Sequence, residues 1–386
     1  MVIINFEAPQ NIKMKKYAIF FPQFHQVAVN DKAWGAGFTD WALVATANVF
    51  EHWTRRAPAC GFYNLAVEED ARSRFLDASN SGLDGFGIYH YRFEDGPELT
   101  AVERFLATAS APVPPDFGYF FIWANEDWSK RWAGKDTELL KTVPKKPSLD
   151  QVRDHVAYLK PFMLQKCYSR LDGQPMFVFY RPDFFDDPAT TIALYRQEFE
   201  SVGISPKLGY FAKNTSEAEL SNLFDFCYLF EPRLYQNFGG VRSSRFVHLV
   251  ASKLVKSIPY SYWEYVSSLA AKFLNQDSKS SQFEKFLEYF SSDKRQAFAK
   301  SFECKTQNVV TCGWNNAPRY RERFNEIVQT PTGTQFKSLV SLAVNDLSVS
   351  SSIPLLCNAW NEWSEGAAIE PCVYLGDDLL LAYVNR

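Results

Sequence analysis

The sequence has few features that would mark a metal site, a disulfide framework or a secretion signal. Its seven cysteines form no CxxC pair and no cysteine–histidine ligand spacing, so buried free thiols are expected. The first sixteen residues contain no apolar stretch ahead of a cleavage site, which predicts no signal peptide. No run of eighteen apolar residues occurs, which predicts no transmembrane helix. We therefore expect a cytoplasmic protein with reduced thiols.

The signatures of several enzyme classes are missing as well. No GxGxxG follows the first predicted strand, and no P-loop or GxSxG elbow occurs, so neither a dinucleotide site nor a serine-hydrolase nucleophile is expected. No HxH or HExxH pattern occurs, so we expect no metal and no cofactor. The formal net charge is −3, which offers no basic surface for nucleic acid.

Aromatic residues, by contrast, are abundant: they make up 16% of the chain and include 10 Trp. Many belong in a core, but several tryptophans stand beside polar residues at the ends of apolar runs. These are Trp123, Trp128, Trp132, Trp360 and Trp363. An indole ring offers an apolar face and a polar N–H, which suits it to stacking on a sugar. The pattern favours a carbohydrate-binding surface.

Eight apolar runs, each followed by polar or charged residues, repeat along the chain. They cover residues 17–25, 84–91, 117–125, 175–180, 208–212, 224–230, 308–314 and 353–360. Amphipathic helical stretches lie between most of them, over residues 68–81, 98–109, 149–165, 187–202 and 335–349. This alternation predicts the α/β class, and eight strands fit a (β/α)₈ barrel that spans residues 1–386 as a single domain. An open, doubly wound sheet is the alternative.

Two segments do not fit the simple repeat. Residues 26–67 form a long first loop rich in Trp, Gly, Phe and Asn, and loops of this length are usually functional or disordered. Residues 233–307 are rich in Ser, Lys and Phe and show helical periodicity. We interpret them as a helical insertion between the sixth and seventh strands, over the barrel mouth.

The most distinctive stretch is LLCNAWNEWSEG at residues 355–366. An apolar run opens there into two carboxylates, Glu362 and Glu365, that stand among tryptophans. Carboxyls among indole rings are partly desolvated, which raises their pKa and suits them to acid/base work. Because glycoside-bond chemistry generally needs two carboxyls, we predict that both are catalytic and that Asn361 and Trp363 bind substrate. Exposed loop charges are the alternative.

A second cluster follows the third predicted strand. Asn125 and Glu126 would face the same mouth as the catalytic pair, because active sites of such barrels lie at the carboxyl ends of the strands. We predict that both bind substrate, together with Trp123 and Trp128. Asp127 fits a site residue and a helix-capping acid equally well.

Further substrate contacts are predicted at other strand ends. They are Gln23, His25, Asp31, Trp41, His90, Tyr91, Tyr180 and Asn315. A packing or hydrogen-bonding role is the alternative for each histidine. Glu231, which precedes Pro232, is a weaker candidate for one more carboxylate in the mouth.

In order and spacing, these motifs resemble the WbsX-like family of polysaccharide-biosynthesis proteins. The matching segments are residues 17–25, 30–31, 34–41, 61–64, 85–91, 123–128, 172–175, 313–319, 360–366 and 370–371. That family is similar in turn to glycoside hydrolase family 99, the endo-α-mannosidases and endo-α-mannanases, which are (β/α)₈ barrels. The resemblance implies a retaining mechanism in which the sugar's own 2-hydroxyl attacks and forms a 1,2-anhydro intermediate.

The resemblance also implies residue roles. Glu362 would be the base that acts on the 2-hydroxyl, Glu365 the general acid and then base at the leaving group, and Glu126 a substrate-binding carboxylate. The chain departs from the family pattern in its binding loops, at residues 54–58, Asn64, Arg92 and Ala133. The catalytic tip therefore matches while the sugar contacts differ.

These observations predict a carbohydrate-active enzyme of surface-polysaccharide assembly, such as O-antigen or lipopolysaccharide. It would act at an α-glycosidic linkage of an oligosaccharide or polysaccharide. One alternative is an endo-acting α-glycoside hydrolase. Another is a non-catalytic glycan-binding barrel that uses its tryptophan-rich mouth only to hold sugar.

Overall fold

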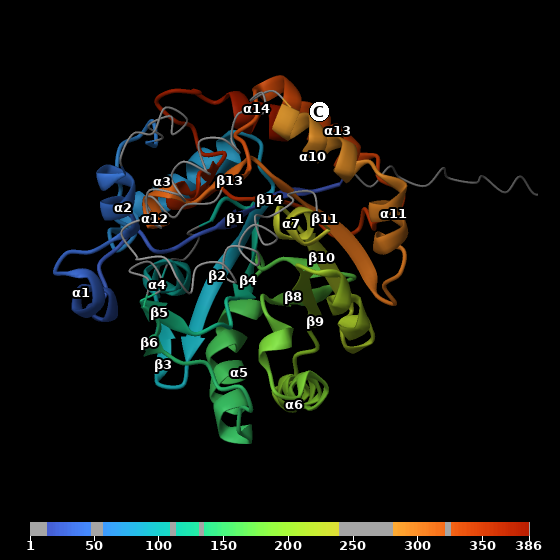
Figure 1. Cartoon of the computed structure of the whole chain (residues 1–386). Helices are drawn as coiled ribbons and strands as arrows, with labels where there is room; N and C mark the ends of the chain where they lie inside the picture. Colours follow the sequence, from blue (N-terminus) through green and yellow to red (C-terminus); the bar gives the residue numbers. More distant parts are fainter. Residues whose placement is uncertain are drawn as a thin grey trace, which may run out of the picture.

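A closed ring of eight strands forms the centre of the molecule (Figure 1). The computed structural model describes residues 14–47, 57–108, 113–130, 135–238, 281–320 and 326–385. The ring strands follow one another in chain order: β1 (Lys16–Phe20), β2 (Gly85–Phe93), β4 (Gly118–Trp123), β8 (Gln174–Phe179), β9 (Lys207–Ala212), β10 (Phe226–Phe230), β11 (Lys305–Thr311) and β14 (Leu355–Asn358).

Every pairing in the ring is parallel, and the last strand pairs with the first. Lys16 of β1 lies opposite Leu355 of β14 on one side, and Tyr17 lies opposite Gly85 of β2 on the other. The sheet therefore closes on itself, and the open-sheet alternative is wrong. All residues of β1 and β10 are buried, as expected for strands covered on both faces. The predicted (β/α)₈ barrel is confirmed.

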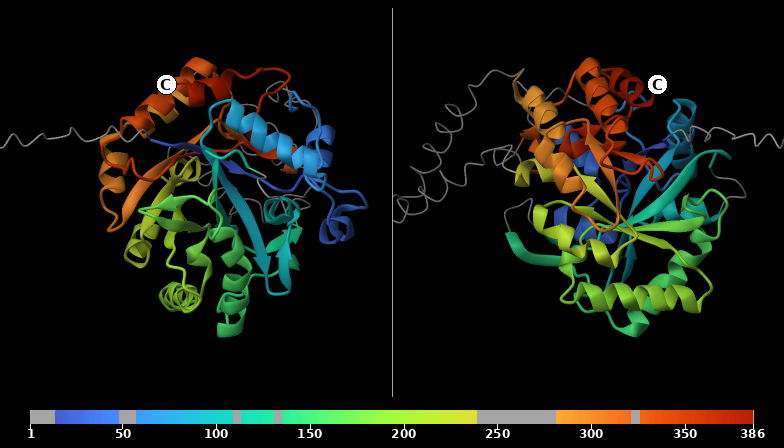
Figure 2. Two further views of the ribbon diagram at one scale, coloured as in Figure 1. Left: turned by 180° about the vertical axis from the view of Figure 1, so that it is seen from behind. Right: turned by 90° about the vertical axis from the view of Figure 1, so that its right-hand side faces the viewer.

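Helices surround the ring (Figure 2). The five predicted helical stretches correspond to α3 (Glu68–Asn80), α4 (Ala101–Thr108), α5 (Leu149–Met163), α6 (Pro188–Ser201) and α13 (Gly333–Val344). α5 and α13 begin at capping boxes, in which Ser148 and Thr332 exchange hydrogen bonds with the glutamine three residues later. A 3-10 helix (Thr215–Leu223) follows β9, and α14 (Asp378–Val384) follows β14.

Short elements extend the loops between ring strands and helices. The long first loop holds α1 (Ala28–Trp34) and α2 (Asp40–Thr46). The others are β3 (Gly96–Glu98), β5 (Trp128–Lys130), β6 (Lys135–Lys141), β7 (Arg170–Leu171), a 3-10 turn (Pro182–Phe184), β12 (Trp314–Asn315), α12 (Ala317–Tyr320), β13 (Glu326–Val328), β15 (Asn361–Glu362) and β16 (Ala367–Ala368).

The described ends of the predicted insertion are helical. α7 (Arg233–Asn237) follows β10, and α10 (Ser281–Phe290) and α11 (Asp293–Ala299) precede β11. Residues 239–280, the middle of the predicted insertion, lie outside the described residues. The helical periodicity is therefore confirmed for these three helices, while the position of the whole segment over the mouth stays a prediction.

A buried ion pair joins α11 to the ring. The Arg295 guanidinium donates to Glu231 Oε1 (3.1 Å) and to Asn308 Oδ1 (2.9 Å). The side chains of Arg295 and Glu231 are both fully buried. Glu231, which the sequence offered as a carboxylate of the mouth, therefore points to α11, because its partner cation comes from that helix.

Replacing Arg295 by methionine is expected to lower the free energy of unfolding by about 3–5 kcal/mol, because it leaves the Glu231 carboxylate buried without its cation. Urea unfolding at neutral pH measures the difference. Lys294→Met, at the exposed neighbouring position, is the matched control and should change stability by less than about 0.5 kcal/mol. Equal stability of the two variants would contradict the structural role of the ion pair.

All seven cysteines are free thiols. Among the described residues, no helix combines the length and the hydrophobicity that are needed to cross a membrane.

Candidate active site

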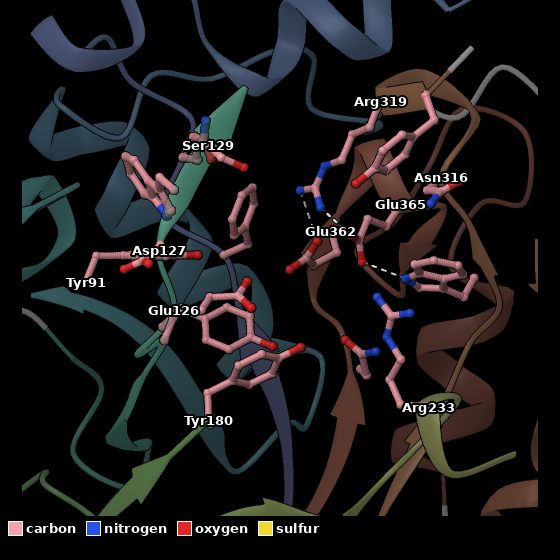
Figure 3. A pocket seen from close by; sticks show the side chains of 18 of the residues that line it. Tyr91, Glu126, Asp127, Ser129, Tyr180, Arg233, Asn316, Arg319, Glu362 and Glu365 are labelled. Carbon is pink, nitrogen blue, oxygen red and sulfur yellow. Dashed lines mark hydrogen bonds and ion pairs between the residues drawn. The ribbon is translucent and has the colours of Figure 1, made fainter. Parts of the chain in front are cut away.

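A cavity of about 200 Å³ opens at the carboxyl ends of the ring strands (Figure 3). Its lining comes from the carboxyl-terminal ends of β2, β10 and β14 and from segments that follow β1, β4, β8, β10, β11 and β14. Glu362, Glu365 and Arg319 lie on one side, facing Glu126 and Tyr180 on the other (Figure 3). The cavity therefore occupies the position at which barrels of this type hold their active sites.

The chain brings Glu362 and Glu365 to the same cavity by a tight turn. Glu362 ends β15, which pairs with β16, and Glu365 ends the 3-10 turn (Trp363–Glu365) between them. The next residue, Gly366, has a φ of 66°, a left-handed conformation that glycine adopts without steric cost. The turn places both carboxyls in the lining of one cavity.

Arg319 binds both carboxyls. Its guanidinium contacts Glu365, lies 3.3 Å from Glu362 Oε2 and lies 3.7 Å from Asp40 Oδ1. Trp314 adds a second donor to Glu365, because its indole Nε1 lies 2.6 Å from Oε2. The Arg319 side chain is 10% exposed and Asp40 is fully buried, so these charges interact away from bulk water.

Burial sets the electrostatics of this side of the cavity. It raises the pKa of Glu362 well above its usual range, the Glu365 charge raises it further, and Arg319 opposes both. Burial also raises the pKa of Asp40. Although burial disfavours the Arg319 cation, the carboxylates of Glu365, Glu362 and Asp40 outweigh it and raise the pKa of Arg319. Arg319 thus stays charged, while Glu362 holds a proton more readily than an exposed glutamate.

The opposite wall carries two further carboxyl residues and two phenols. Glu126 lies 3.8 Å from the Arg181 guanidinium, and Asp127 accepts from the backbone N–H of Val143 (2.8 Å). Burial raises the pKa of Tyr91 and of Tyr180, and the Glu362 and Glu126 charges add to both effects. Both tyrosines are therefore neutral hydroxyls that can bond to a sugar.

Seven of the residues predicted from the sequence line this cavity. They are Gln23, Tyr91, Glu126, Trp128, Tyr180, Glu362 and Glu365. The structure brings them together from five ring strands, so the predicted substrate and catalytic residues among them share one space. Their individual roles stay predictions.

Asn125 and Asn361, which the sequence placed in contact with substrate, instead tie neighbouring strand ends together. Asn125 donates to Arg181 O (2.7 Å) and accepts from Arg181 N (2.7 Å). Asn361 donates to Phe21 O (3.0 Å) and accepts from Phe21 N (2.7 Å). The oxygen and the nitrogen of each side-chain amide are therefore both bonded to backbone groups. These residues connect the end of β4 to the end of β8 and the end of β14 to the end of β1, and they do not line the cavity.

Three predicted tryptophans also lie outside the cavity lining. Trp123 donates to Arg92 O (3.2 Å), Trp41 to Tyr63 O (2.7 Å), and Trp363 to Glu370 Oε2 (2.8 Å). Each side chain is buried, and its one N–H is already bonded. They support the walls of the site rather than offer stacking faces.

The two histidines are structural in this arrangement. His90 is fully buried and bonds to Glu103 Oε1 (2.7 Å) and His155 Nε2 (2.9 Å), away from the cavity. His25 bonds to Pro22 O (3.0 Å), and burial lowers its pKa to about 4. The packing alternative therefore describes both better than substrate contact.

Asp31 and Asn315 are likewise absent from the lining. Asp31 Oδ1 accepts from the backbone N–H groups of Gly37 and Phe38, and Asn315 bonds to Glu326 and Ala317. Both stabilise loops near the mouth.

The cavity residue with the most contacts to the two carboxyls, Arg319, was not among the residues predicted from the sequence. The sequence holds it in a matching motif, residues 313–319, but no local pattern predicts its pairing with carboxylates that lie more than forty positions away. Trp314 and Arg233 also line the cavity without having been predicted. Within the described part of the chain, no group of three or more His, Cys, Asp and Glu side chains is arranged to hold a metal ion.

Comparisons with known proteins agree with this architecture. The GH99 endo-alpha-mannosidase from Bacteroides thetaiotaomicron is 13% identical, with a TM-score of 0.53 over 96% of this chain and 95% of that one. A glycoside hydrolase-like protein is 15% identical, with a TM-score of 0.53 over 98% and 95% of the two chains. At such identities the likeness shows the shared barrel fold.

Comparison of the sequence with known proteins identifies relatives and a family. The uncharacterized protein WxcX of Xanthomonas campestris pv. campestris (strain B100) is 26% identical over 376 residues, which cover 95% of this chain and 49% of WxcX. The chain thus spans about half the length of the curated relatives it matches. The model of the family "Glycosyltransferase WbsX" matches residues 16–383. The chain therefore belongs to the WbsX glycosyltransferase family of carbohydrate-active enzymes.

Proposed function

We propose that the chain breaks and forms α-glycosidic bonds with retention of configuration, using Glu362 and Glu365. The observation that carries this proposal is the convergence of both carboxyls on one cavity, where they share the Arg319 guanidinium. Two carboxyls in one sugar-sized space are the usual machinery of glycoside chemistry.

In the proposed first step, Glu362 takes the proton of the sugar's 2-hydroxyl while O2 attacks C1. Glu365 donates a proton to the leaving oxygen, and the C1–O bond breaks to leave a 1,2-anhydro sugar. In the second step, Glu365 takes a proton from an acceptor hydroxyl, whose oxygen bonds to C1. The C1–O2 bond opens, and Glu362 returns its proton to O2.

The surroundings of Glu362 and Glu365 influence which of the two carboxyls holds a proton. Burial favours a proton on Glu362, whereas Arg319 and Trp314 donate to Glu365. Two interacting carboxyls titrate as a pair, and the proposed roles require that the pair hold one proton, located on Glu365 when the linkage breaks. A bound 2-hydroxyl that hydrogen-bonds to Glu362 would favour this distribution, because it stabilises the ionised form.

The acceptor decides between transfer and hydrolysis. A sugar hydroxyl gives transfer, and water gives hydrolysis, with the same carboxyls in both cases. Membership of a glycosyltransferase family supports transfer. We propose surface-polysaccharide assembly as the setting of this transfer, with an oligosaccharide as the substrate class. An endo-acting hydrolase is the second form of the same chemistry.

Proton NMR of the first-formed product tests the proposal. With aryl α-glycosides of several hexoses and a sugar acceptor present, we expect an α-configured product, seen before mutarotation. A β-configured product would contradict the retaining mechanism. Oligosaccharide binding without turnover of any glycoside or donor would instead assign the chain as a glycan-binding barrel.

A further inference from the structure

One cation in the cavity has no part in the proposed chemistry. Arg233, the first residue of α7, lines the cavity on the same side as Glu365 (Figure 3). Its guanidinium carbon lies 4.7 Å from the centroid of the Trp314 ring. Trp314 in turn donates to Glu365, so Arg233 and the carboxyl proposed to act at the leaving group both contact the Trp314 side chain.

The two arginines of the cavity are used differently. Arg319 is occupied by Glu362, Glu365 and Asp40. Arg233 contacts Gln236 Oε1 (3.3 Å) and the Trp314 ring, and forms no ion pair with a carboxylate of the described residues. Arg233 is thus a cation of the cavity lining whose charge is available for a negative group on the substrate.

Two contacts restrict the Arg233 side chain. Its guanidinium lies over the Trp314 ring, and one of its N–H groups donates to Gln236 Oε1 (3.3 Å). A guanidinium has five N–H donors in a planar fork that matches the two oxygens of a carboxylate. The contact with Gln236 occupies one of these donors.

The charge of the cavity limits what the ligand can be. Four carboxyl groups line it, Glu126, Asp127, Glu362 and Glu365, against the guanidiniums of Arg233 and Arg319. A diphosphate brings several negative charges into this acidic space and would need more cations than Arg233 alone. A single carboxylate needs one.

We propose that the substrate is an acidic sugar whose carboxylate binds Arg233 in the subsite next to Glu365. This inference rests on the proposed function, because it names the substrate class of the same site. It makes Arg233 a specificity-determining residue: the enzyme would prefer a hexuronate to the hexose of the same configuration.

Calorimetric binding of matched ligands tests the proposal. Methyl α-hexuronosides of gluco, galacto and manno configuration are compared with the methyl α-hexosides, which differ only at C6. In at least one pair the acid is expected to bind about 10- to 100-fold more tightly, the effect of charge-assisted hydrogen bonds. Arg233→Met, which keeps the apolar stem, should abolish this ratio, and Arg233→Lys should retain part of it.

Arg196→Met is the matched control. Arg196 pairs with Asp225 away from the cavity lining, so the ratio of affinities should equal that of the unaltered protein. Thermal melting of each variant establishes that it is folded before titration. The inference is overturned if no pair shows the preference, or if Arg233→Met preserves it. It is also overturned if UDP binds more tightly than every hexuronoside through Arg233, which would assign the cation to a diphosphate.

The measurement separates this inference from the proposed function because it needs no turnover. Equal binding of acid and neutral ligands, together with loss of turnover in Glu365→Gln, would overturn the acidic-sugar assignment alone. A preference for the acid that depends on Arg233, together with unchanged turnover in Glu365→Gln, would overturn the proposed function alone.

Discussion

Glu365→Gln is expected to lower the turnover of an α-glycoside with a basic leaving group by about 10²- to 10⁴-fold, the usual range for loss of a general acid. The loss should shrink when the leaving group is an acidic phenol, because such an oxygen departs without a proton. Glu362→Gln should lower turnover to a similar extent, but equally for all leaving groups, since its proposed role is at the 2-hydroxyl. Initial rates on a series of aryl α-glycosides measure both effects.

Glu288→Gln is the control, since Glu288 is exposed on α10 and absent from the cavity lining. If the dependence on leaving group belongs to Glu362→Gln instead, the two roles are exchanged. The comparison of the two variants is informative because burial favours a proton on Glu362, whereas the proposed roles require the proton on Glu365 when the linkage breaks. Full turnover in both variants would contradict the two-carboxyl mechanism altogether.

Arg319→Met is expected to lower the free energy of unfolding at neutral pH by about 3–5 kcal/mol. The variant leaves Glu362, Glu365 and Asp40 close together without the guanidinium that balances them. Arg104→Met, at an exposed position on α4, should cost less than about 0.5 kcal/mol.

The pH dependence of this loss has a defined sign. Burial already raises the pKa of Glu362 and Asp40 in the folded protein, and removing Arg319 raises both further. A carboxyl whose pKa is raised on folding binds more protons folded than unfolded, so its contribution to stability falls as pH rises from the unfolded pKa through the folded one. Urea unfolding at pH 5 and pH 8 should therefore show a larger deficit at pH 8. An equal deficit at both values would mean that Arg319 acts by packing rather than by charge.

The fold follows from the sequence because its signals are local. Each ring strand is an apolar run covered on both faces, as β1 and β10 show, and α5 and α13 carry capping boxes that mark their starts. Strand ends are also local features, so the sequence could place the site at the mouth of the barrel.

Which side chains enter the cavity is harder to predict. Neighbouring residues of a strand point to opposite faces: Tyr89 and Tyr91 line the cavity, and His90 between them is buried behind it. The same holds for Glu362, which lines the cavity, and Asn361, which bonds to Phe21. A sequence shows that polar residues follow a strand, but the direction of each depends on the register in which the ring closes.

Ion pairs between residues that lie far apart in the sequence cannot be predicted from local patterns. Arg319 follows β11 and reaches carboxylates that follow β14 and one that begins α2. Nothing near Arg319 in the sequence identifies those partners, because only the closed ring brings the three loops together.

The order of the strands has a consequence for synthesis. β14 is the last ring strand, and it closes the barrel against β1, where the Tyr383 hydroxyl donates to Tyr17 O and Leu355 O (both 2.9 Å). On the ribosome, the segments that carry Glu126 and Tyr180 emerge long before Glu362 and Glu365. A nascent chain therefore lacks both carboxyls of the proposed catalytic pair until its final ring strand has been translated. The strand that closes the ring and the two carboxyls are delivered together, at the end of synthesis.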